Sequence, residues 1–77
     1  MKIISTTDLS REGNDCYIYE SVSLVEEFGM YMVITCSKVV GRIESEDVYF
    51  WGEPTIGIED AKQIYWEHGG NLNAIQE

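Results

Sequence analysis

The segment that most constrains the fold covers residues 30–36 and has the sequence MYMVITC. β-branched and aromatic residues favour strands, and apolar side chains here occupy both alternating positions. A strand that is apolar on both faces is typical of the centre of a covered sheet. The segment therefore predicts a central strand with at least partial cover on both sides.

Further strand-like segments lie on both sides of this one. They cover residues 3–7, 16–22 and 48–51, and a shorter candidate at 39–43 contains Gly41, which indicates a bulge or a close backbone approach. Because the connections are too short for crossovers, the segments predict a mostly antiparallel sheet of about four strands.

Polar segments separate these strands. Residues 8–15 and 44–47 are rich in turn formers and predict loops. We expect residues 52–54 to end the sheet, because Pro54 has no N–H to donate to a strand ladder.

Residues 23–29 fit two structures. Ser23 and Glu26 have the spacing of a capping box, and Gly29 could follow a single helical turn as its C′ residue. Alternatively, the preceding strand continues and residues 26–29 form a hairpin loop. The hairpin is favoured, because an isolated helical turn is only marginally stable and both flanking segments resemble strands.

The clearest helix prediction begins at Gly57, which stands at the N-cap position. Glu59 and Asp60 fall in the first turn, where carboxylates complement the helix dipole. An apolar face follows at helical spacing and comprises Ala61, Ile64, Tyr65 and His68. Gly69 and Gly70 are expected to end the helix.

Together these elements predict one α+β domain over residues 1–77, with one C-terminal helix packed on a face of a small antiparallel sheet. A chain of this length buries only about 60–65% of its unfolded surface. A hydrophobic content of 44% is nevertheless sufficient for a packed core. In the tail, Leu72 and Ile75 are expected to add apolar cover.

No residue pattern indicates catalysis, a cofactor or a metal site. His68 is the only histidine, and its place on the apolar helix face favours a capping or core role over that of a base. Cys16 and Cys36 are expected as small core residues in neighbouring strands, with a disulfide as the alternative. The sequence lacks a CxxC motif, so it predicts no zinc site.

The chain carries fourteen Asp and Glu residues against five Lys and Arg, a formal net charge of −9. Nucleic acids and anionic membranes both require basic side chains, so neither is an expected partner. The excess charge instead favours a basic protein surface. No apolar run is long enough to span a membrane and the N-terminus lacks a signal-peptide pattern, so we expect a cytoplasmic protein.

Six acidic residues fall within seventeen consecutive positions: Glu44, Glu46, Asp47, Glu53, Glu59 and Asp60. If the last strand ends beside the helix start, their carboxylates share one edge of the fold and resemble a line of phosphates. Such an edge could occupy the Lys- and Arg-rich groove of a nucleic-acid-binding protein. An acidic surface without any partner is the alternative.

An aromatic strand lies among these acids. Strand alternation places Tyr49 and Trp51 on one face and Val48 and Phe50 on the other. One face should meet the helix, which leaves the other for solvent, a partner or a second subunit. Trp51 inside a rim of carboxylates would make a partner anchor, since Trp is enriched at binding hot spots. Trp51 and the six acids are therefore the predicted partner-binding residues, and a plain core strand is the alternative.

In size, acidic charge and sheet-plus-helix layout, the chain resembles phage-encoded inhibitors, including anti-CRISPR proteins. This resemblance covers the whole chain and implies binding to a host nuclease or surveillance complex over its basic nucleic-acid channel. We therefore expect a non-enzymatic inhibitor of a basic, nucleic-acid-binding protein. The alternative is a small structural or regulatory accessory protein that forms a homo-oligomer through an exposed sheet edge or the aromatic face.

Overall fold

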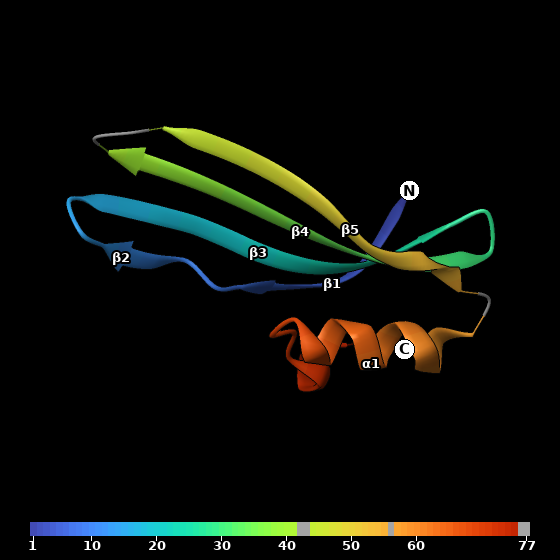
Figure 1. Cartoon of the computed structure of the whole chain (residues 1–77). Helices are drawn as coiled ribbons and strands as arrows, with labels where there is room; N and C mark the ends of the chain where they lie inside the picture. The colour runs from blue at the N-terminus through green and yellow to red at the C-terminus, as the bar shows by residue number, and fades with distance from the viewer. Residues whose placement is uncertain (42–43, 56, 76–77) are drawn as a thin grey trace.

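The computed structural model describes residues 1–41, 44–55 and 57–75, with only the backbone described at residues 52, 53, 55 and 74. An antiparallel sheet with the strand order β1-β3-β4-β5 lies against one C-terminal helix, and a short strand, β2, pairs with β3 (Figure 1). The predicted α+β architecture is confirmed. The elements are β1 (Lys2–Asp8), β2 (Arg11–Gly13), β3 (Cys16–Glu27), β4 (Met30–Gly41), β5 (Ser45–Thr55), α1 (Ile58–Glu67) and the 3-10 helix η1 (Leu72–Ala74).

The hairpin of β3 and β4 forms the centre of the sheet. Its turn consists of Phe28 and Gly29, both with positive φ (53° and 75°), as two-residue hairpin turns require. The hairpin alternative for residues 23–29 is therefore confirmed, although the strand continues through Glu27. β4 runs without a break to Gly41 and joins two segments predicted as separate strands. The end of the second prediction, at Ile43, lies outside the described residues.

Three predictions of where the sheet is interrupted are wrong. Residues 45–47 of the predicted loop 44–47 already belong to β5, where they pair with the end of β4. Part of the polar segment 8–15 forms β2, which pairs with the start of β3. β5 also continues through Pro54 to Thr55, although residues 52–54 were expected to end the sheet. β5 is the last strand of the order, and an edge strand tolerates proline because one side of its backbone has no neighbouring strand.

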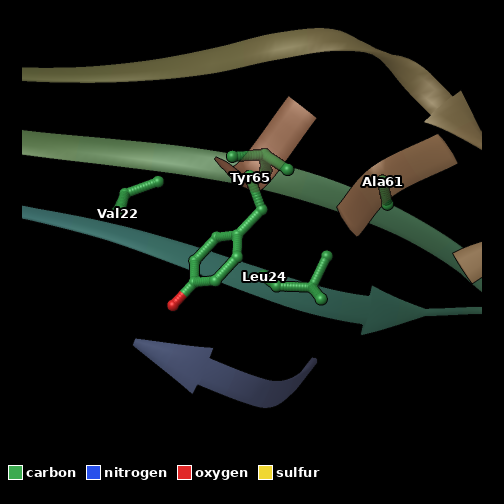
Figure 2. Packing of buried hydrophobic residues seen from close by; sticks show 5 residues of the cluster. Val22, Leu24, Ala61 and Tyr65 are labelled. Atoms are coloured by element: carbon green, nitrogen blue, oxygen red, sulfur yellow. The ribbon is translucent and has the colours of Figure 1, made fainter. Parts of the chain in front are cut away.

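The core lies between α1 and one face of the sheet. Its buried side chains, shown in part in Figure 2, are Val22, Leu24, Val33, Ala61 and Tyr65. The Tyr65 ring lies between the helix and β3, and its hydroxyl points towards β1 (Figure 2). There it forms hydrogen bonds with Ser5 Oγ at 3.1 Å and Thr7 Oγ1 at 2.6 Å. The predicted buried face of the helix is thus confirmed at Ala61 and Tyr65.

The helix begins and ends where the sequence indicated. Gly57 is the N-cap and His68 the C-cap of α1. Gly70 is buried, and a Cβ atom there would lie 2.5 Å from the Tyr65 ring, so the close packing of the helix end needs glycine. Ile75 packs against the core as expected, whereas Leu72 is exposed.

The sheet is much longer than the helix that covers it (Figure 1). The molecule measures 41 × 22 × 18 Å. β2, the start of β3, the end of β4 and the start of β5 extend beyond α1. The sheet therefore has one face half covered by α1 and an opposite face that no helix covers.

Candidate functional site

The strand register assigns each side chain to one of the two sheet faces. Directly opposed residues of an antiparallel pair share a face, and successive residues alternate. Val22 and Leu24 point to the helix, so the residues between and beside them on β3 point away from it. We call this second face the open face; its residues include Thr6, Asp8, Glu12, Tyr17, Tyr19, Ser21, Ser23, Ile34, Cys36, Lys38, Val40, Glu46, Val48 and Phe50.

Trp51 lies on the helix side, within the contact between α1 and the sheet. Its indole stacks on the His68 imidazole with ring centroids 3.8 Å apart, and its Nε1 donates to Thr35 Oγ1 at 2.9 Å. Tyr49 shares this face, as predicted, with its ring centroid 4.4 Å from that of Trp51. The structure therefore places the predicted anchor Trp51 partly inside the fold, where it holds the end of α1 to β5.

Val48 and Phe50 occupy the open face of the same strand. Their side chains are 54% and 56% exposed. The register places them opposite Cys36 and Ile34 of β4. The exposed aromatic residue of β5 that is directed away from the helix is thus Phe50, which sequence reasoning did not select. The alternation in the sequence defined the two faces but could not tell which of them the helix covers.

The acidic residues follow β5 but do not converge. Glu44 precedes this strand, and Glu46 and Asp47 lie near its start. Glu59 and Asp60 lie in the first turn of α1, which begins only after β5 has ended. Eleven extended residues span about 34 Å. The two groups therefore lie at opposite ends of β5, the edge strand that carries the predicted line of acids.

One further position, Glu53, completes the predicted set. Glu53 belongs to the last part of β5, whose end does adjoin the helix start as expected. Glu46 and Asp47 point to opposite faces, since Glu46 pairs with Lys38 on the open face and Asp47 with Ser37 on the helix side.

Few of these carboxylates have a cationic partner within the described chain. Of the predicted group, only Glu59 forms an ion pair between described residues, with Lys62 Nζ at 3.4 Å. Its side chain is still 83% exposed. Glu44, Glu46 and Asp60 are also exposed. These acids are therefore accessible to a partner that brings its own positive charge.

A shallow depression of about 190 Å³ lies in the middle of the open face. Asp8, Tyr19, Lys38 and Glu46 line it, together with Cys36. Hydrogen bonds from the side chain and the backbone N–H of Ser10 stabilise the charged form of Asp8 and lower its pKa below the ordinary value. The depression is open to solvent and combines charges of both signs with an aromatic ring.

The cysteines differ from their prediction. Both are free thiols in neighbouring strands, but Cys36 is exposed, so its predicted place in the core is wrong. The register puts Cys36 opposite Ser21 on the open face and Cys16 opposite Gly41 on the helix side. The two thiols thus lie on different faces of the sheet.

The described residues contain no group of three or more His, Cys, Asp or Glu side chains placed to hold a metal ion. In the same part of the chain, no helix has the length and apolar character needed to cross a bilayer. Comparisons with protein-family models, curated proteins and solved structures found no match. The resemblance to phage-encoded inhibitors therefore stays a prediction.

Proposed function

We propose that the chain is a non-enzymatic interaction protein that binds a basic, nucleic-acid-binding protein and inhibits it by occupying its nucleic-acid site. The observation that supports this most is the exposure of carboxylates at both ends of β5 in an elongated fold, with Glu44 and Glu46 at one end and Glu59 and Asp60 at the other. Such a charge distribution steers a basic partner towards the chain and raises its association rate.

The magnitude of the charge limits how far mimicry alone can act. A duplex as long as this molecule, 41 Å, carries about 24 negative charges at one per about 1.7 Å. The chain has a net charge of only −9. Charge can therefore guide the encounter, but competition with nucleic acid needs additional contacts that a nucleic acid does not make.

We place this activity in the cytoplasm. Both cysteines of the chain are free thiols, as is usual in a reducing compartment. A basic, nucleic-acid-binding target would be found there as well.

Displacement of nucleic acid tests the proposal. A fluorescent duplex is bound in turn to each of a set of purified nucleases and nucleic-acid-binding proteins, and the chain is added at low salt. Release of the duplex from at least one of them, with less release at higher salt because the charges are screened, is the expected result. Retention of the duplex by every protein in the set, even with the chain in excess, would contradict the proposal.

One observation favours a second candidate, a homo-oligomeric accessory protein. β5 is an edge strand with two exposed apolar side chains, Val48 and Phe50, and such edges can pair with a second copy. The like charge of two copies opposes this association. Sedimentation over a range of concentrations decides the matter: a concentration-dependent dimer supports this candidate, and a strict monomer excludes it.

A further inference from the structure

We infer that the open face is the surface on which the partner docks, and that its occupant is a basic protein surface with an apolar centre bordered by Lys and Arg. This inference rests on the proposed function and specifies which side of the sheet carries it. The apolar and aromatic side chains of the open face would also provide the contacts that charge alone cannot provide.

The apolar part of the open face lies on β4 and β5. Phe50 and Val48 are each more than half exposed, and Ile34 lies beside Phe50 with only 8% of its surface exposed. Exposed apolar side chains that are adjacent on one face mark interaction sites more often than apolar residues scattered singly. These residues therefore provide the centre of a contact.

A second aromatic group lies on β3 of the same face. The rings of Tyr17 and Tyr19 have centroids 4.6 Å apart, and both side chains are exposed. Tyrosine combines a large apolar area with a polar tip and is enriched at binding hot spots. The depression lined by Tyr19, Lys38 and Glu46 lies beside them.

The charges of the open face select the occupant. By register, Asp8, Glu12 and Glu46 lie on this face against one cation, Lys38, among its described strand residues. If two copies stacked through this face, the acidic side chains of one copy would lie against those of the other. Each chain has a net charge of −9, so this contact would be repulsive. A basic protein surface instead meets complementary charge, so it fits this face better than a second copy does.

The size of the face agrees with such a contact. Four rows, namely β3, β4, β5 and the edge formed by β1 and β2 together, lie about 4.8 Å apart and are about 34 Å long, which gives a flat area of about 650 Å². One partner contributes about 800 Å² of accessible surface to a typical specific interface. Most of the open face would therefore be covered in the complex.

The test is a titration of the isotope-labelled chain with a cationic hairpin peptide that has leucines at the centre of one face and lysines along its borders. Amide resonances of Tyr19, Val48 and Phe50 are expected to shift. Shifts centred on Glu59 and Asp60 would overturn the docking surface but leave the proposed function standing. The absence of any shift at low salt would count against both.

Adjacent residues of β5 provide matched variants. Phe50 and Tyr49 are 56% and 57% exposed but lie on opposite faces. Phe50→Ser is expected to weaken peptide binding about tenfold, whereas Tyr49→Ser changes it less than about twofold. Equal effects of the two substitutions would reject the open face as the contact surface. Circular dichroism of both variants checks that the fold is retained.

Cys36 reports on the same surface without a change at the contact centre. In a Cys16→Ser chain, bound peptide should slow alkylation of Cys36 at least about fivefold, because the thiol lies beside Val48 on the open face. An unchanged alkylation rate at saturating peptide contradicts the inference. Sedimentation of the free chain tests whether a second copy of the chain occupies the open face instead. A dimer that Phe50→Ser abolishes would assign the open face to that second copy and overturn the inference.

Discussion

The imidazole ring of His68 stacks on the indole ring of Trp51, with centroids 3.8 Å apart and ring planes 18° apart. His68 is the C-cap of α1 and Trp51 belongs to β5, so this contact joins the end of the helix to the edge strand. Strand alternation then directs Phe50, the preceding residue, to the opposite face. The packing that fixes the helix thus also places Phe50 on the face that no helix covers.

Trp51→Ala should lower the free energy of unfolding by about 2–3 kcal/mol, because a large, partly buried side chain and its contact with His68 are lost. Tyr49→Ala, on the same face but more exposed, should cost about 1 kcal/mol or less. Urea unfolding followed by circular dichroism measures both. Similar losses for the two variants would argue against Trp51 as the link between helix and sheet.

Tyr65→Phe should destabilise the chain by about 1–2 kcal/mol. The buried Tyr65 hydroxyl hydrogen-bonds Ser5 and Thr7, and its removal leaves the Ser5 hydroxyl buried without this partner. Tyr19→Phe removes a hydroxyl from an exposed ring and serves as the control, with little expected change. Equal stability of the Tyr65→Phe variant and the wild type would show that these hydrogen bonds do not stabilise the fold.

Gly70→Ala should cost about 2–3 kcal/mol, since a new methyl group would overlap the Tyr65 ring. Gly29→Ala is the comparison: it has a positive φ of 75° but no atom within 4 Å of the new Cβ, so a cost of about 1 kcal/mol is expected. Thermal and urea unfolding measure both changes. A smaller effect at Gly70 than at Gly29 would mean that the helix end is less tightly packed than described.

Tyr31 provides a prediction about pH. Its hydrogen bond to Glu26, on the neighbouring strand, raises the pKa of the Tyr31 hydroxyl. Because the folded pKa exceeds the unfolded value of about 10, the stabilising contribution is present below that pH and disappears as the pH rises through the folded pKa. Glu26→Gln should therefore lower the pKa of Tyr31, as followed by the NMR titration of its ring. An unchanged titration would assign the shift to another cause.

The local elements could be predicted well from the sequence because their causes are local. Phe28 and Gly29 form the expected hairpin, and Gly57 and His68 bound the expected helix. The strand lengths could not be predicted, since pairing with neighbouring strands extends β5 through Pro54 despite its missing N–H.

The positions of the candidate site residues depend on tertiary contacts, namely on strand pairing and on the packing of the helix. A longer β5 moves Glu46 away from Glu59, so acids close in sequence lie at opposite ends of the strand. Likewise, Tyr49 and Phe50 have similar exposed fractions, but Tyr49 lies on the face that α1 packs against and Phe50 lies on the open face. Strand alternation shows that Tyr49 and Phe50 point to opposite faces of the sheet. Which of these faces the helix covers is decided by contacts with a distant part of the chain, such as the stacking of His68 on Trp51.

The proposed function requires that exposed carboxylates of this chain occupy the nucleic-acid site of a basic protein. Duplex displacement with a charge-reversed chain is the most direct test of this requirement. The triple variant Glu44→Lys, Glu46→Lys, Asp47→Lys changes the exposed acids at the free end of β5 and leaves the described core untouched. We predict that the wild-type chain releases duplex from at least one nucleic-acid-binding protein at low salt, and that the variant associates with that protein at least about tenfold more slowly and releases little. Equal release by the wild type and the variant, or no release by the wild type from any protein in the set, would contradict the proposal.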